Sequence, residues 1–276
     1  MKCGYIFQSN SSLGDPVLAI SSSDSIPKLK EEIKALQQKF DVLQRRFWLE
    51  PLEPIWQYRG KFYLGKTKDV EDKDQVTPFL LANFVDASNK TLYRRRIYID
   101  LGIKDFNSSL CWMMQNYPIK FDAMYGFECE RDMTNVATLR DPINRCISET
   151  AAEKMGYTTE GTMDTLKVYH NFIGLDEDLE TSPHTRGLSQ FLKDIDIQED
   201  DFVVLKMDVE GIEFSLLERM MANGTYKLID EIFVEIHYRH PDMQPFGWDI
   251  FEHSLSDAQA LFTKARDMGI YIHPWP

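Results

Sequence analysis

The chain has few cysteines and no long hydrophobic run, and both absences narrow what it can be. Only four cysteines occur among 276 residues, and none forms a C-x-x-C pair. The sequence therefore predicts neither a disulfide framework nor a cysteine-based zinc site. No apolar run approaches the ~20 residues of a membrane-spanning helix. The first twenty residues also lack the continuous apolar segment of a signal peptide.

Positive charge is scarce as well. Lysine and arginine number 31 against 44 acidic residues, a net charge of −13. Because nucleic-acid binding needs a basic face, this composition argues against a nucleic-acid partner. The only dense basic cluster is Arg94-Arg95-Arg96, and a solvated segment at the start of a strand explains it better than an anion site. Otherwise, hydrophobic content of 43% and charged content of 27% are ordinary for a globular protein.

Four Asn-x-Ser/Thr triplets are present, and such triplets accept N-linked glycans in secreted proteins. They begin at Asn10, Asn89, Asn107 and Asn223. Triplets of this kind arise often by chance, so they predict little without a secretory signal. The default compartment is the cytoplasm, although the helix described next also suits an endomembrane enzyme.

The N-terminal region divides into a loose segment and a helix. Residues 1–25 are rich in serine and predict a flexible lead-in. Residues 26–50 predict an amphipathic helix whose apolar positions follow a heptad spacing of four and three. These positions are Leu29, Ile33, Leu36, Phe40, Leu43 and Phe47. The helix either packs on its own domain or forms a coiled coil, which would give a homodimer through residues 29–47.

Residues 51–95 predict an extension that packs on a sheet. It contains a hairpin at 56–64 and a helix at 77–85, for which Thr77 is the expected N-cap. With 276 residues, the chain has room for one large domain beside this extension.

Over residues 96–276, strand-like and helix-like segments alternate, which predicts an α/β domain with a doubly wound, mostly parallel sheet. The expected strands are 96–101, 121–128, a weaker pair within 144–174, 202–208, 229–237 and 269–273. The expected helices are 108–116, 131–139, 187–194, 212–222 and 255–268. Ligands of such sheets bind at the carboxyl ends of the strands.

The first strand of this domain ends in Asp100 and Gly102, where a glycine lets the backbone approach a ligand closely. The second glycine of a nucleotide-binding turn is missing. Asn107 is its best substitute, because asparagine tolerates a left-handed backbone. Ser108 and Ser109 can cap the following helix, whose first amides favour an anionic group. A Walker A loop is excluded, since no G-K-[ST] follows.

An acid closes the second strand as well. Glu128 stands where a ribose-binding carboxylate belongs, and Glu130 is a second choice. The competing interpretation of Glu128 is a surface acid at a strand end.

Further acids and a histidine close two later strands. Asp208 and Glu210 share one side of their strand with Lys206, which a structural ion pair would also explain. His237 follows Glu235 by two residues and could remove a proton if a carboxylate orients it. The competing interpretation is a hydrogen-bonded histidine at a strand end. A divalent metal among these residues is chemically possible, but the sequence fixes no ligand geometry, so none is predicted.

Three segments together resemble FkbM-type S-adenosylmethionine-dependent methyltransferases. They are Y-I-D-L-G at 98–102, F-E at 127–128 and, most specifically, V-L-K-M-D-V-E-G-I-E at 204–213. The segment I-D-E-I-F-V-E-I-H at 229–237 is most similar to plant and algal members. The likeness covers roughly residues 95–276.

This resemblance implies a Rossmann-like fold that binds S-adenosylmethionine and methylates a hydroxyl group, often on a sugar. By position, it implies that Asp100 and Gly102 approach the methionine moiety and that Glu128 holds the ribose. It also implies that residues 208–213 line the reaction centre. The usual fold closes with an antiparallel hairpin, whereas one strand clearly follows Tyr238 here. The seventh strand is then either absent or supplied by residues 55–65.

The sequence thus predicts an O-methyltransferase acting on a sugar, a polysaccharide or a small metabolite. The predicted catalytic residues are His237 as base, Asp208 as its rival, and Glu210. The predicted cofactor-binding residues are Asp100, Gly102, Asn107, Ser108, Glu128 and Glu130. Two alternatives stay open: a non-catalytic Rossmann-like interaction module that has lost the cofactor, and a metal-dependent transferase or hydrolase.

Overall fold

A computed structural model describes most of the chain from residue 76 onward and short stretches before it. The described residues are 27–34, 36, 40, 48–52, 73, 76–148, 150–241, 244 and 247–275. The chain separates into two compact units, Met1–Asp41 and Val42–Pro276. The predicted lead-in over 1–25 and the hairpin at 56–64 lie outside the described residues, as does the proposed source of a seventh strand at 55–65.

In the first unit, residues 27–34 are helical, as are Leu36 and Phe40. The apolar residues of the heptad stripe that are described, Leu29, Ile33, Leu36 and Phe40, are between 52% and 66% exposed. The homodimer through residues 29–47 stays a prediction. Among the described residues, no helix has the length and apolar character needed to cross a membrane.

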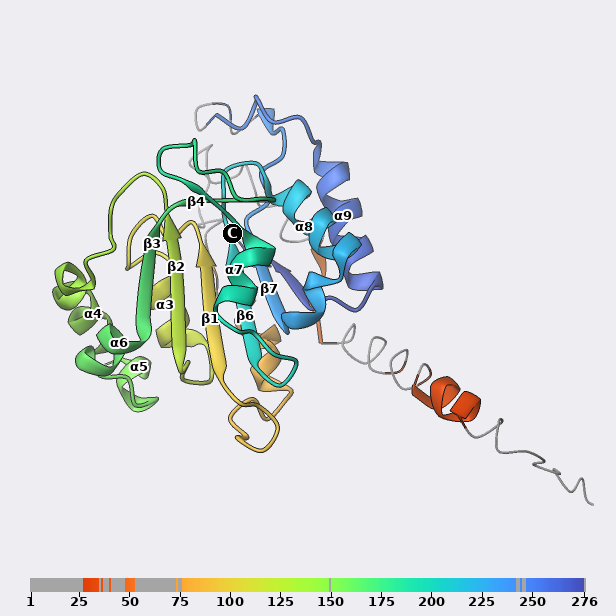
Figure 1. Ribbon diagram of the computed structural model, residues 1–276, viewed down its shortest axis with the longest axis horizontal. Helices are drawn as coiled ribbons and strands as arrows, with labels where there is room; N and C mark the ends of the chain where they lie inside the picture. Colours follow the sequence, from red (N-terminus) through yellow and green to blue (C-terminus); the bar gives the residue numbers. More distant parts are fainter. Residues whose placement is uncertain are drawn as a thin grey trace, which may run out of the picture. The chain divides into compact units, whose positions relative to one another are not determined.

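The second unit is built on a six-stranded sheet (Figure 1). In spatial order its strands are β3 (Leu166–His170), β2 (Ala123–Glu128), β1 (Arg96–Leu101), β6 (Phe202–Met207), β7 (Glu231–Val234) and β8 (Ile272–Pro274). All five neighbouring pairs are parallel. The chain enters the sheet at β1, near its middle, and continues outward through β2 to β3. It then returns to β6, on the other side of β1, and continues through β7 to β8. This α/β architecture was predicted, and its strand order is compatible with a Rossmann-like fold.

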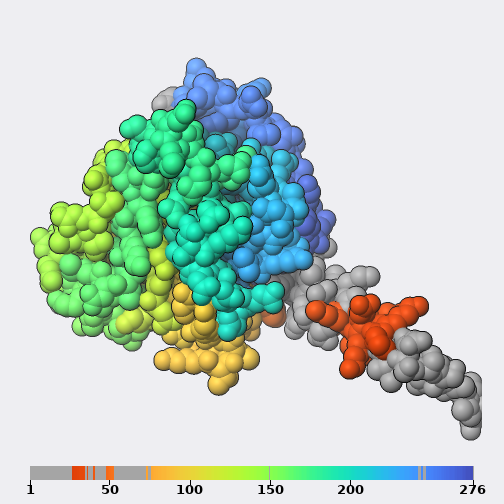
Figure 2. All heavy atoms as spheres, viewed as in Figure 1, coloured from red at the N-terminus to blue at the C-terminus, as the bar shows by residue number. Residues whose placement is uncertain are grey.

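Helices cover both faces of the sheet because side chains of each strand alternate between two cores. Ile97 and Ile99 enter one core, whereas Tyr98 enters the other. The first core includes residues of α7 (Leu188–Asp194), α8 (Glu213–Asn223) and α9 (Leu255–Asp267). In Figure 2, α7 and α8 lie side by side over this face. The second core includes residues of α3 (Leu110–Asn116), α4 (Arg140–Ile147) and the segment 76–87.

The remaining elements are short. They are η2 (Thr77–Phe79), η3 (Leu81–Asn83), η4 (Val136–Leu139), α5 (Ala151–Lys154), α6 (Thr159–Thr165), η5 (Thr225–Leu228) and a two-stranded sheet of β4 (Phe172–Gly174) with β5 (Thr185–Gly187). The predicted helix at 77–85 is instead two 3-10 turns, η2 and η3. Val76, not Thr77, is the N-cap of η2, and it has no side-chain cap. A pair of strands, β3 and β4, does lie within 144–174 as predicted, but both follow residue 165 and they belong to different sheets.

The prediction of a helix at 131–139 is wrong, because local side-chain hydrogen bonds hold its first residues out of helical structure. The Asp132 carboxylate accepts a hydrogen bond from the Thr134 amide at 3.0 Å. The Asn135 side chain then accepts one from the Ala137 amide at 3.2 Å, as the N-cap of η4. Such bonds compete with helical ones, so helical structure starts only after residue 135.

A disulfide joins Cys111 of α3 to Cys146 of α4, whose Cα atoms are 5.7 Å apart. The two cysteines are 35 residues apart in sequence and come together because α3 and α4 pack against each other. The sequence did not predict this bridge. Cys129, which follows β2, is a free thiol.

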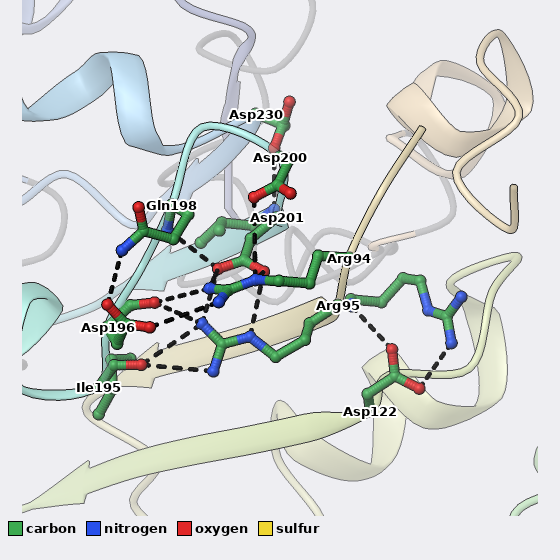
Figure 3. Close-up of polar contacts among 11 residues, drawn as sticks. Arg94, Arg95, Asp122, Ile195, Asp196, Gln198, Asp200, Asp201 and Asp230 are labelled. Carbon is green, nitrogen blue, oxygen red and sulfur yellow. Dashed lines mark hydrogen bonds and ion pairs between the residues drawn. The ribbon is translucent and has the colours of Figure 1, made fainter. Parts of the chain in front are cut away.

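The arginine cluster lies where the chain enters β1 and is neutralised by acids (Figure 3). Arg94 and Arg95 both contact the buried Asp201 carboxylate, at 2.8 Å and 2.6 Å. Burial raises the pKa of Asp201, but hydrogen bonds from Arg95 and Arg94 outweigh it and hold this pKa well below its usual range. Arg96 contacts Asp122 at 2.6 Å. These contacts give the cluster a structural role in place of an anion site.

A buried ionic network ties residues 48–52 to the last strand. Glu50 contacts Arg266 of α9 at 2.6 Å and Nδ1 of His273 in β8 at 2.7 Å. The other ring nitrogen, Nε2 of His273, lies 2.9 Å from Oε1 of Glu231 in β7. Burial lowers the pKa of His273, but the charges and hydrogen bonds of Glu50 and Glu231 outweigh it and raise this pKa from 6.5 to about 9. His273 is therefore an imidazolium at neutral pH.

We expect this network to make stability fall with rising pH. Because the pKa of His273 is higher in the folded state, its contribution is complete below about pH 6.5 and is lost as pH rises through about 9. The loss is on the order of 3 kcal/mol. Urea unfolding at pH 6, 8 and 9.5 measures it. His273→Gln should remove this part of the pH dependence, and an equal slope in both proteins would contradict the assignment.

Candidate active site

The candidate site lies at the carboxyl ends of β1, β2, β6 and β7. β1 and β6 are neighbours, and the direction in which the chain winds reverses between them. Loops that leave the sheet at such a reversal separate and open a crevice, where ligands of doubly wound sheets bind. The segments after these four strands contain most of the residues that the sequence singled out.

Gly102, directly after β1, is required by the close approach of two strand ends. Its φ is +92°, and a Cβ here would lie 1.8 Å from the carbonyl oxygen of Asp208. The next left-handed residue in this turn is Lys104, with a φ of +51°. The prediction that Asn107 supplies the left-handed backbone is therefore wrong. The backbone amide of Asn107 instead donates a hydrogen bond to the Asp105 carboxylate at 2.8 Å.

The two serines of this turn do not cap α3. The Ser108 hydroxyl donates to the carbonyl oxygen of Ile103 at 2.6 Å, and the Ser109 hydroxyl donates to the Asp100 carboxylate. Ser109 is the N-cap residue of α3, but its side chain makes no cap bond. Both hydroxyls therefore make hydrogen bonds within the turn, and an anion at the first amides of this helix stays a prediction.

Asp100 is completely buried in a polar cluster under the turn. The Tyr98 hydroxyl donates to Oδ2 of Asp100 at 2.9 Å, and Nζ of Lys206 lies 3.3 Å from Oδ1. Burial lowers the pKa of Lys206, but the charges of Asp100, Asp208 and Glu235 outweigh it and raise this pKa above its ordinary value. Contact between Asp100 and a ligand would require the carboxylate to leave these partners.

Glu128 closes β2 and holds two loops together. Its Oε2 accepts from the Lys104 amide at 2.8 Å, and its Oε1 accepts from the Glu130 amide at 2.6 Å. The residue is only 6% exposed, whereas Glu130 is exposed. A carboxylate offers about four acceptor positions, so Glu128 can accept further hydrogen bonds from a ligand.

His237 follows β7 and is 3% exposed. Its Nδ1 lies 2.8 Å from Oε1 of Glu213, and its Nε2 lies 3.3 Å from Oε2 of Glu210 and 4.0 Å from Oδ1 of Asp208. The Trp248 ring is 4.9 Å from the imidazole, centroid to centroid. Glu213 thus holds Nδ1, while Nε2 faces the carboxylates of Asp208 and Glu210.

The acid that orients His237 is Glu213, the first residue of α8, whereas the sequence called for an orienting carboxylate without identifying it. Glu213 is completely buried, and it also accepts hydrogen bonds from the amides of Val209 and Gly211, each at 3.0 Å. It therefore fixes both the loop after β6 and the imidazole. The sequence signal that could have indicated this role is a glutamate in the first turn of a helix, two residues after a glycine.

The same contacts set the charge of His237. Burial lowers its pKa, but the hydrogen bond and charge of Glu213, with the charges of Glu235 and Glu210, outweigh it and raise this pKa above 6.5. A buried carboxylate on Nδ1 favours proton transfer at Nε2, because it stabilises the imidazolium that results.

Asp208, Glu210 and His237 also form a possible cation site. Each offers one ligand atom, and these atoms lie within 4.8 Å of one another. The ring N–H of a metal-bound histidine that does not face the metal usually donates a hydrogen bond to a carboxylate, as Nδ1–H of His237 can to Glu213. The arrangement is thus suited either to proton transfer or to holding a divalent cation.

Comparison with known proteins gives one match. Residues 157–276 match the family DUF7870, described as a domain of unknown function. The matched segment contains Asp208, Glu210, Glu213 and His237, and it leaves out β1 and β2 with Gly102 and Glu128. No curated protein and no solved structure matches the chain.

Proposed function

We propose that the chain is an S-adenosylmethionine-dependent O-methyltransferase with a Rossmann-like fold. One observation carries the proposal. A single edge of the parallel sheet holds both the buried Glu128, with acceptor positions to spare, and the oriented imidazole of His237. The first suits ribose hydroxyls, and the second suits removal of a proton from an acceptor hydroxyl.

The residues at this edge fit such a cofactor in part. Glu128 would hold the ribose, next to the turn at Gly102, and the acids Asp208 and Glu210 favour a cationic ligand. Asp100 and Ser108 are engaged within the protein. When bound, the cofactor supplies an electrophilic methyl group on a sulfonium. Binding of this ligand therefore depends on Glu128 more than on the serines.

The residues of the chain would act mainly by positioning. Displacement at a methyl group needs an aligned acceptor, and a base need only take the hydroxyl proton late. Nε2 of His237 is the atom that takes this proton, and Glu213 stabilises the charged ring. Asp208, the rival base, is paired with Lys206 at 3.2 Å. The acceptor class that fits this chemistry is a hydroxyl of a sugar, a polysaccharide or a small metabolite.

Calorimetric titration with S-adenosylmethionine tests the proposal without knowledge of the acceptor. We expect Glu128→Ala to weaken binding about 100-fold, because two hydrogen bonds to a charged acceptor are lost. The exposed Glu130→Ala is the matched control and should have much less effect. Glu128→Gln, which keeps one acceptor oxygen for the loops, separates lost binding from a collapsed turn. No binding by the unaltered chain would favour a non-catalytic interaction module.

A second candidate, a metal-dependent transferase or hydrolase, is favoured by the ligand atoms of Asp208, Glu210 and His237. A divalent cation there would activate water or a hydroxyl in place of a free imidazole. The two candidates differ in one measurable respect, since only the second requires Nε2 of His237 to bind a cation.

A further inference from the structure

Two features of the second unit have no role in methyl transfer. One is the disulfide between Cys111 and Cys146. The other is the Asn-Lys-Thr triplet that begins at Asn89, in the loop that leads into β1. This loop lies before the amino end of β1, whereas the candidate site is at the carboxyl end. The two features are independent, and both depend on the compartment in which the chain folds.

The disulfide is built into the second core. Cys111 and Cys146 are 9% and 3% exposed, so the bridge forms as α3 and α4 pack together. Joining two thiols releases two protons and two electrons, and a disulfide-exchange protein accepts the electrons and becomes a dithiol. Cytosolic pools keep thiols reduced, whereas the lumen of the endoplasmic reticulum oxidises them.

The triplet at Asn89 is folded in a way that leaves its nitrogen available. Oδ1 of Asn89 accepts from the Thr91 amide at 2.9 Å and from the Thr91 hydroxyl at 2.6 Å. Within the described part of the chain, nothing accepts a hydrogen bond from Nδ2 of Asn89. Thr91 and its neighbours Lys90 and Leu92 are exposed, so this loop has room for a bulky group.

The other triplets are less suitable. Nδ2 of Asn223 donates to the Ser189 hydroxyl at 3.2 Å. Asn107 lies in the turn after β1, where a glycan would obstruct the candidate site. The triplet at Asn10 lies outside the described residues.

We propose that the chain folds in an oxidising compartment of the secretory pathway, where Cys111 pairs with Cys146 and Asn89 receives an N-linked glycan. In the transfer, Nδ2 of Asn89 forms a bond to C1 of a lipid-diphosphate-linked oligosaccharide. The C1–oxygen bond to the diphosphate breaks, Nδ2 loses one proton, and the lipid diphosphate leaves. Neither step depends on the methyltransferase activity.

Peptide mapping of protein made in eukaryotic cells from its full-length coding sequence tests both parts. The cells are lysed in excess iodoacetamide, which blocks free thiols, and the protein is digested with a protease without reductant. A peptide N-glycosidase then removes the glycans from the peptides in heavy-oxygen water. We expect the Cys111 and Cys146 peptides to be linked, Cys129 to be alkylated, and Asn89 to be converted to labelled aspartate.

Two hydroxyl-free variants serve as a matched pair. Thr91→Val should abolish the label at Asn89, and Thr225→Val should leave it unchanged. Alkylated Cys111 and Cys146 in the unaltered protein would overturn the disulfide and the compartment. Unlabelled Asn89 in protein whose disulfide is intact would overturn the glycan site.

Discussion

Replacing Gly102 with alanine is expected to destabilise the second unit by about 4 kcal/mol or more, among the largest effects of a single substitution. Two costs add. A left-handed backbone with a Cβ costs about 1–2 kcal/mol, and here the φ is +92°. The added carbon would also lie 1.8 Å from the carbonyl oxygen of Asp208, so the ends of β1 and β6 must move apart. Urea unfolding measures the change.

Gly156 is the matched control for this substitution. Its φ is +84°, and a Cβ there meets nothing within 4 Å. Gly156→Ala should therefore carry only the backbone cost of about 1–2 kcal/mol. Equal losses for the two variants would mean that the strand ends separate freely, and the close approach at Gly102 would then not shape the site.

The alternation of strands and helices was the part of the fold that the sequence predicted well. The strand at 96–101 matches β1, and the strand at 202–208 matches β6 to within one residue. Both are apolar runs buried on two faces, so pattern and structure have a single cause. The prediction of a helix at 131–139 was wrong because the side chains of Asp132 and Asn135 accept local hydrogen bonds, which cannot be deduced from the spacing of apolar residues.

The site was predicted less completely, because its roles depend on contacts between distant elements. Strand ends placed Glu128 and His237 at one edge of the sheet correctly. The role of Glu213 was missed, since a partner 24 residues away in sequence was less visible than Glu235, two residues away. The disulfide was missed for the same reason, because only the packing of α3 on α4 brings its cysteines together.

Glu213 and Glu210 contact the same imidazole, and we expect them to differ sharply in effect. Glu213→Ala should cost about 3–5 kcal/mol, because it leaves the buried Nδ1 of His237 and the half-buried amides of Val209 and Gly211 without an acceptor. Glu210→Ala should change stability by less than about 0.5 kcal/mol, since this side chain is 80% exposed. Urea unfolding of both variants makes the comparison.

The state of the imidazole shows whether Glu213 acts on His237 or only on the loop. In nitrogen-15 NMR of the unaltered protein, we expect Nδ1 of His237 to be held in its protonated form, and Glu213→Gln to disturb it more than Glu210→Gln does. An undisturbed Nδ1 signal in Glu213→Gln would contradict orientation by Glu213.

Titration with Zn²⁺, Mn²⁺ and Mg²⁺ in the same NMR experiment separates the two candidate functions. A saturable change of the Nε2 signal that Glu210→Gln abolishes would favour the metal-dependent enzyme. If none of the three cations changes the Nε2 signal, the imidazole is free to act as the base.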